Sequence, residues 1–115
     1  AQVMAMREAT VKATHGFDFV ITPTSPIPAF EAEYCCPDND PERALEHIAF
    51  TVPYNMSEQP AASINWSYST QKRTVGLPIG VQVAGRRFDD LGVLQLSRVI
   101  EQIRPVQRPW PVHIG

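Results

Sequence analysis

Residues 61–85, AASINWSYSTQKRTVGLPIGVQVAG, decide the fold class. Apolar and polar residues alternate in the first part of this stretch, and Ile79, Val81 and Val83 take every second position in the last part. Side chains of a β-strand point alternately to opposite faces, so each part predicts a strand with one buried face. In the first strand the predicted buried residues are Ala62, Ile64, Trp66 and Tyr68, and the opposite face carries Ser63, Asn65, Ser67 and Ser69. A hydrophilic turn separates the two strands, which we expect to be neighbours in one sheet.

Helices are predicted on both sides of this stretch. Residues 1–14 are rich in Ala and Met and predict a helix, which we expect Gly16 to end in the left-handed conformation. Residues 42–51 predict a second helix, capped by Asp40 and ended by Pro53. The third runs from Asp89 or Asp90 to about residue 103, and its apolar residues cover more than one narrow stripe.

The remaining segments complete the predicted order. Residues 17–22, FDFVIT, predict a short buried strand that Pro23 ends. Residues 23–41 contain five prolines and predict a long surface loop. Helices and strands in this order predict an α/β fold, part of a mixed β-sheet flanked by helices. A chain of 115 residues predicts one unit, with an extended proline-rich tail over residues 104–115 and with apolar surface left uncovered.

Composition excludes several classes of partner. A net charge of -2 favours neither nucleic acid nor an anionic membrane, and no apolar run approaches the ~20 residues that span a bilayer. The two cysteines, Cys35 and Cys36, are adjacent, which is poor geometry for a mutual disulfide and not a zinc spacing. A reducing compartment, and hence the cytoplasm, fits best, although a vicinal redox pair stays an alternative to two thiols in a loop.

The usual catalytic and cofactor motifs are not found in the sequence. It contains no GxSxG elbow, HExxH pair, Walker loop or dinucleotide turn. His15, His47 and His113 do not have the spacing of a common metal site. Lys12 and Lys72 fall on a predicted helix surface and in a polar turn, whereas a catalytic lysine needs a desolvated site that lowers its pKa. We therefore expect no catalytic residue, metal or cofactor in this chain.

Four phrases in order resemble the amidase signature family. They are residues 17–26 (FDFVITPTSP), with the family's D-x-x-x-x-P-T turn; 50–62 (FTVPYNMSEQPAA), with its P-x-N-x-(T/S)-G-x-P-A connection; 77–85 (LPIGVQVAG); and 88–101 (FDDLGVLQLSRVIE). Glu58 departs from the pattern because it stands where the family usually has glycine. The chain thus resembles the C-terminal portion of an amidase signature hydrolase.

The resemblance implies an enzyme that hydrolyses a carboxylic amide to an acid and ammonia or an amine. The serine nucleophile, second serine and lysine of such enzymes lie in an earlier part of the family's sequence, so we expect this chain to be inactive alone. Its partners would be a small amide substrate, through the full-length enzyme, and the N-terminal part of its parent or a second copy of itself. A non-catalytic interaction or structural module on an amidase-like scaffold is the alternative.

One predicted helix face resembles a wall of the family's substrate pocket. Leu45, Ile48 and Val52 fall at helical spacing on one stripe, and they correspond to the face that lines the acyl pocket. They could equally pack in the core. In glutamine-specific members of the family, the position of Ile48 is acidic and binds the substrate's amino group. Ile48 therefore favours an apolar or aromatic amide over glutamine.

Overall fold

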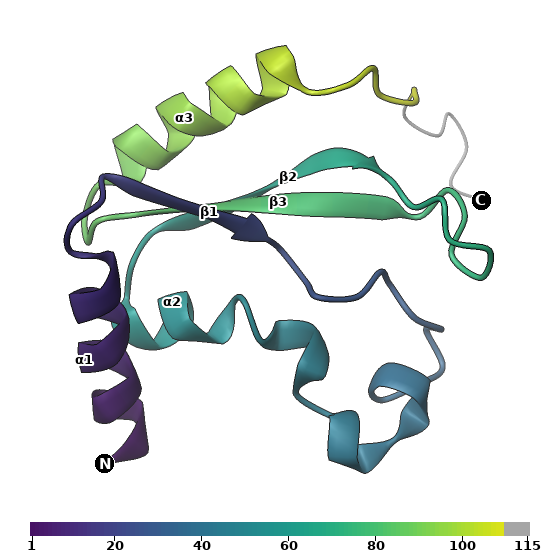
Figure 1. Cartoon of the computed structure of the whole chain (residues 1–115), viewed down its shortest axis with the longest axis horizontal. Helices are drawn as coiled ribbons and strands as arrows, with labels where there is room; N and C mark the ends of the chain where they lie inside the picture. Colours follow the sequence, from purple (N-terminus) through teal and green to yellow (C-terminus); the bar gives the residue numbers. More distant parts are fainter. Residues whose placement is uncertain (110–115) are drawn as a thin grey trace.

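The computed structural model describes residues 1–109 (Figure 1). The chain has two long helices, α1 (Gln2–Thr14) near its start and α3 (Asp90–Ile103) near its end. A short helix, α2 (Val52–Ser57), lies between them in sequence. The strands are β1 (Phe19–Pro23), β2 (Ala61–Tyr68) and β3 (Pro78–Gly85). The loop between β1 and α2 contains three 3-10 turns, η1 (Pro37–Asn39), η2 (Pro41–Arg43) and η3 (Glu46–Ile48). None of the helices in this part of the chain is long and apolar enough to cross a membrane.

The three strands form one sheet in the order β1-β3-β2, with β3 antiparallel to both neighbours. The predicted pairing of the two alternating strands is confirmed, and a loop over residues 69–77 joins them. Two backbone hydrogen bonds close that loop, from Ser69 N to Leu77 O and from Gly76 N to Ser69 O, both 2.8 Å long. The fold class is therefore α/β, with a sheet flanked by helices, and the three strands described here are antiparallel throughout.

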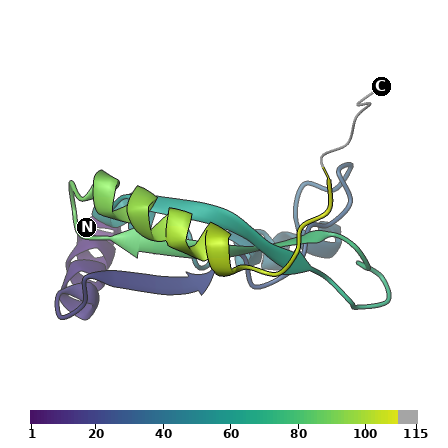
Figure 2. The same cartoon turned by 90° about the horizontal axis from the view of Figure 1, so that it is seen from above.

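The core lies between this sheet and α3, which runs along one of its faces (Figures 1 and 2). Ile64 and Val83 from the sheet pack against Val93 and Ile100 from the helix. Burying each of these side chains contributes roughly 1.5–3 kcal/mol. The helix begins as the sequence predicts, because the Asp89 carboxylate accepts a hydrogen bond of 3.0 Å from the backbone of the first turn. Its outer face leaves four large apolar side chains exposed: Leu91, Leu94, Val99 and Ile103.

A β-bulge in β2 corrects the predicted alternation. Asn65 lies opposite Gly80, yet Ser67 lies opposite Ile79, so Trp66 is an extra residue without a partner in β3. The bulge interrupts the strict alternation of side chains after Trp66. Tyr68, predicted on the buried face, packs against the Arg108 guanidinium, 4.4 Å from its ring centroid, and lines a hollow together with Ser67 and Ser69.

The predicted helix over residues 42–51 is wrong. The Asp40 carboxylate does accept a hydrogen bond of 3.0 Å from Glu42 N, but the segment it caps is the 3-10 turn η2. Leu45 then breaks the helical backbone with φ -103° and ψ 2°. A short helix needs an apolar face to bury, and the Leu45 side chain remains 72% exposed. Pro53 does not end a helix but stands in the first turn of α2, where a missing N–H costs nothing.

At the ends of α1 and α2, no glycine adopts the left-handed conformation. Gly16 follows α1 but does not have a positive φ, and the chain leaves the helix through a turn in which Phe17 N donates to Thr14 O. The left-handed residue is instead Glu58, which ends α2 with φ 58° and ψ 33°. This is the position where glycine is expected from the family pattern. The expectation for Gly16 is wrong because the helix ends at His15, whose dihedrals are right-handed with φ -57° and ψ -32°.

The described part of the tail, residues 104–109, lies without helix or strand against β2. The Arg104 guanidinium donates to Asn65 O at 2.8 Å, and Gln107 Nε2 donates to Trp66 O at 3.0 Å. Both carbonyls belong to the bulge, whose ladder bonding is interrupted. The tail therefore satisfies backbone groups that β3 leaves without partners. The rest of the predicted tail, including His113, is outside the described residues.

Candidate functional site

A hollow of about 810 Å³ opens over the end of the sheet where β2 and β3 meet the loop after β1. Its lining is rich in hydroxyl groups, which come from two separate segments of the chain, residues 24–25 and 63–70. The hydroxyl-bearing residues are Thr24, Ser25, Ser63, Ser67, Tyr68, Ser69 and Thr70. Apolar lining is supplied mainly by Ile27, Phe30 and Ile79. Such a mixture of apolar walls and a few converging polar groups is typical of small-molecule sites.

Gly80 lets two of these hydroxyls meet. Thr24 Oγ1 and Ser63 Oγ are 2.7 Å apart and share a hydrogen bond, although 39 positions separate the residues in sequence. A Cβ atom on Gly80 would lie 2.6 Å from Thr24 Oγ1 and 2.9 Å from Ser63 Oγ. The backbone also connects Thr24 with Gly80, because Thr24 N donates a hydrogen bond to Gly80 O at 3.0 Å. The absence of a side chain at Gly80 therefore fixes this corner of the hollow.

His47 reaches the hollow from η3. Its ring stacks edge-on against Phe30, with the ring centroids 5.3 Å apart. Its Nδ1 atom is buried and has no hydrogen-bond partner among the described residues. A buried nitrogen without a partner costs free energy, and a ligand or water in the hollow would satisfy it. Asn65, which also lines the hollow, has a second such atom, its Oδ1, so two lining residues carry an unsatisfied buried polar atom.

Arg43 fixes the loop that carries His47. Its guanidinium forms ion pairs with Asp38 on one side and with Glu46 on the other. The hydrogen bond from Arg43 lowers the pKa of Glu46 below its ordinary value of 4.5. The carboxylate of Glu46 thus remains charged next to His47 in the sequence. This pairing replaces the regular helix as the support of residues 41–48.

The three predicted pocket residues do not lie on one helical stripe. Ile48 and Val52 are half-buried, in η3 and at the start of α2, whereas Leu45 lies exposed between two turns. None of the three lines the large hollow. Sequence reasoning missed the hydroxyls that do line it, although the polar alternation of Ser63, Asn65 and Ser67 indicated a wetted face of the sheet. Thr24 and Gly80 join the site through sheet topology, for which a single sequence gives no signal.

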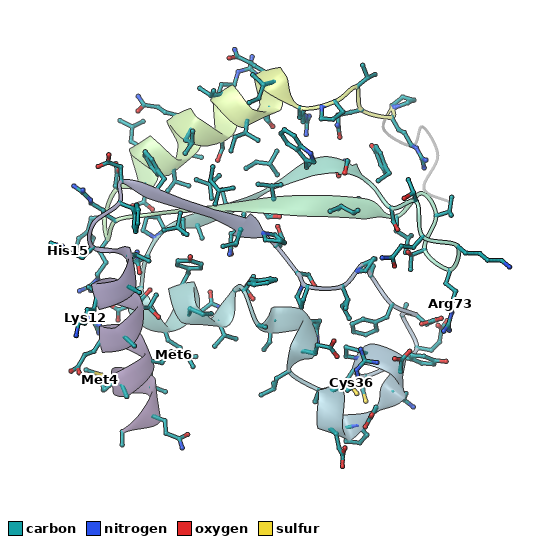
Figure 3. The ribbon with its side chains drawn as sticks, in the orientation of Figure 1. Met4, Met6, Lys12, His15, Cys36 and Arg73 are labelled. Atoms are coloured by element: carbon teal, nitrogen blue, oxygen red, sulfur yellow. The ribbon has the colours of Figure 1, made fainter. Side chains whose placement is uncertain are left out.

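Neither lysine of the chain lines the hollow. Lys12 stands on α1 at the far end of the sheet, as Figure 3 shows, and Lys72 is exposed in the loop between β2 and β3. Neither is among the lining residues, so the seven hydroxyls have no lysine beside them. Within residues 1–109, no three His, Cys, Asp or Glu side chains come together as metal ligands do.

Comparison with known sequences identifies the family. A sequence model of the family described as Amidase matches residues 1–94. The chain belongs to the amidase family. One subunit of the glutamyl-tRNA(Gln) amidotransferase of Thermodesulfovibrio yellowstonii is 36% identical to this amidase chain over 101 residues, covering 88% of it and 20% of the relative. The corresponding subunit from Thermotoga maritima is 38% identical over 89 residues, covering 77% of the chain and 17% of the relative.

Solved structures agree with this assignment. The structure of 6-aminohexanoate cyclic dimer hydrolase, complexed with substrate, superposes on this amidase chain with a TM-score of 0.68 at 30% identity. The superposition covers 91% of the chain and 24% of the hydrolase. The chain therefore spans about a fifth of the length of the curated relatives it matches and a quarter of this hydrolase.

Proposed function

We propose that this chain is the C-terminal portion of an amidase that hydrolyses a carboxylic amide to an acid and ammonia or an amine. In the full enzyme, the chain would contribute part of the scaffold and part of the wall of the substrate pocket. The observation that carries the proposal is the hollow, which is lined by Thr24, Ser63 and His47 together with apolar residues. An amide group both donates and accepts hydrogen bonds. A hydroxyl group can act as the acceptor for its N–H and as the donor for its carbonyl oxygen. The family assignment supports amide chemistry over other reactions that such a site could serve.

We further propose that the chain is inactive alone. Amide hydrolysis by a serine needs a base within hydrogen-bond reach of the nucleophile. No lysine lines the hollow, and His47, which does line it, forms no hydrogen bond with a described hydroxyl. A panel of aliphatic and aromatic amides, with released ammonia or amine as the readout, tests this proposal. No turnover is expected from the chain. Turnover that disappears when Ser63 or another lining serine is replaced by alanine would overturn it.

The substrate's acyl group is proposed to be apolar or aromatic. Leu45, Ile48 and Val52 remain the proposed contacts, although the structure gives them different surroundings. Ile48 is the strongest of the three, because it follows His47, which lines the hollow, and is itself half-buried. An apolar side chain here would leave the charged amino group of glutamine without a partner.

The proposed macromolecular partner is the N-terminal part of the parent amidase or, in its absence, a second copy of the chain. The outer face of α3 and the apolar residues Val3, Met4 and Met6 of α1 are exposed, and patches of this kind mark interfaces. These faces equally suit the alternative, a non-catalytic interaction module on an amidase scaffold. A Gly-Ser-Ser-rich stretch and a lysine encoded upstream in the same reading frame would support the enzyme; a start codon directly before Ala1 would support the module. The two free thiols agree with the proposed cytoplasmic location.

A further inference from the structure

The two cysteines of this chain form a dithiol whose sulfur atoms lie side by side. Cys35 Sγ and Cys36 Sγ are 3.6 Å apart, and both thiols are free. The pair belongs to the loop between β1 and α2, at a distance from the sheet (Figure 3). Each sulfur has its own acceptor: Cys35 Sγ donates to Asn39 Oδ1 at 3.3 Å, and Cys36 Sγ donates to Asp40 O at 3.2 Å. These bonds hold both sulfurs on the same side of the backbone.

This geometry disfavours a disulfide between them. An S–S bond is about 2.05 Å long and usually joins Cα atoms about 4.4–6.8 Å apart. Adjacent residues have Cα atoms only about 3.8 Å apart. Closing the bond would require the sulfurs to approach by more than an ångström and the backbone between them to distort. It would also break both thiol hydrogen bonds.

The same geometry suits a single atom bound by both sulfurs. Two sulfurs each about 2.3 Å from one atom lie roughly 3.4 Å apart around a pyramidal centre with an angle of about 95°, and roughly 3.8 Å apart around a tetrahedral one. The observed separation of 3.6 Å lies between these two values, so the dithiol is preorganised for such a centre. Two ligands are too few for a structural zinc site, which takes four. A soft centre that needs only two protein sulfurs is the class that fits.

We propose that Cys35 and Cys36 together bind soft, thiophilic centres of the trivalent arsenical type, with both sulfurs on one arsenic atom. In the reaction, an aryl arsenoxide loses its oxygen as water, the two thiols supply the two protons, and two As–S bonds form. No electron is transferred. Cys35 is exposed and reacts first, whereas Cys36 is only 2% exposed and closes the ring from within the protein. Burial raises the pKa of the Cys36 thiol, which agrees with this order.

The test uses the full chain and a monoaryl arsenoxide. Intact mass spectrometry should show one arsenical per chain with loss of one water, and both thiols should become unreactive to a thiol reagent. An excess of a monothiol should leave the adduct in place, and a small dithiol should remove it. The second As–S bond forms within the same molecule. The affinity of each single-cysteine variant for the arsenical should therefore be lower than that of the unmodified chain by about 100-fold or more.

Cys35→Ser and Cys36→Ser are the matched variants, and circular dichroism checks their folding. Cys35 is exposed, so Cys35→Ser decides the question even if the buried Cys36→Ser fails to fold. Both folded variants should release the arsenical to a monothiol. Retention by Cys35→Ser as strong as that of the unmodified chain would overturn the proposal, as would an unmodified chain that takes up no arsenical.

Discussion

The Glu58 carboxylate lies against the Arg87 guanidinium at the residue where the chain turns left-handed. Arg7 of α1 approaches the same carboxylate, with Nη2 3.2 Å from Oε2. Glu58 therefore joins the end of α2 to α1 and to the turn after β3. This explains how an acidic residue is accommodated where the family pattern has glycine.

Replacing Glu58 should separate backbone strain from ion pairing. A non-glycine residue in the left-handed region costs about 1–2 kcal/mol, and an exposed ion pair contributes about 0–1 kcal/mol. Glu58→Gly relieves the first and loses the second, so the free energy of unfolding should change little or rise. Glu58→Ala keeps the backbone strain and loses both ion pairs, so the free energy of unfolding should fall by about 1 kcal/mol. Urea denaturation compares them, and equal stability of the two variants would contradict this account.

Gly80→Ala should disturb the corner of the hollow. Its new Cβ would force Thr24 and Ser63 apart, at a cost of about 1–3 kcal/mol. Gly16→Ala is the matched control, because a Cβ there meets no atom within 4 Å. Thermal denaturation should show a lower Tm for the first variant only. Similar Tm values for both would mean that the sheet yields without strain at Gly80.

Gln107→Ala should loosen the bulge of β2. The variant removes the side-chain donor to Trp66 O and the nearer of two acceptors of Asn65 Nδ2, a loss of about 1–2 kcal/mol. Hydrogen exchange of the β2 amides should accelerate together with this loss of stability. Gln102→Ala, on the exposed side of α3, serves as the control and should leave β2 unchanged. Unaltered exchange in Gln107→Ala would show that the tail does not support the strand.

Acid should weaken the support of the His47 loop. The hydrogen bond from Arg43 lowers the pKa of Glu46 in the folded chain, so its stabilising contribution is present above the ordinary value of 4.5. That contribution is lost as the pH falls through the lowered folded pKa. The stability difference between the chain and Glu46→Gln should therefore shrink in acid. Glu33→Gln, which removes none of the ion pairs described, should show no such convergence, and a constant difference for Glu46→Gln would refute the coupling.

In the full-length parent, Ile48→Ala should enlarge the proposed acyl pocket and favour bulkier acyl groups. Ile48→Asp should lower kcat/KM for apolar amides, because an unpaired charge in a half-buried site costs roughly 1–3 kcal/mol. Val75→Ala is the control, because Val75 is an exposed apolar residue that does not line the hollow and is not a proposed contact. If Ile48→Ala lowers Tm and leaves the ranking of substrates unchanged, Ile48 is a core residue.

Periodicity predicts the sheet and α3 because both bury a continuous apolar face. The strands β2 and β3 and the cap at Asp89 follow the sequence closely. Residues 42–57 do not follow it, because their local signals permit a helix in several places and burial decides among them. The bulge at Trp66 has no signal in an alternating sequence, and it interrupts the alternation before Tyr68.

The candidate site is less predictable than the fold. Its polar wall can be seen in the alternation of β2, but its other wall comes from residues 24–30, which reach it only because β1 pairs with β3. The sequence gives no reason to single out His47, since a histidine on a surface helix seldom has a specific role. The turns that replace the helix direct it towards Phe30.

The strand order β1-β3-β2 also governs when the sheet can exist. Among the described residues β1 and β2 share no ladder, and each pairs only with the strand that comes last in the chain. When residues 1–77 have left the ribosome, β1 and β2 would therefore still lack their shared partner strand, and the three strands described here could pair only after residues 78–85 emerge. Non-local pairing of this kind slows folding. A chain stalled before residue 78 should consequently be the state most prone to aggregation and most dependent on chaperones.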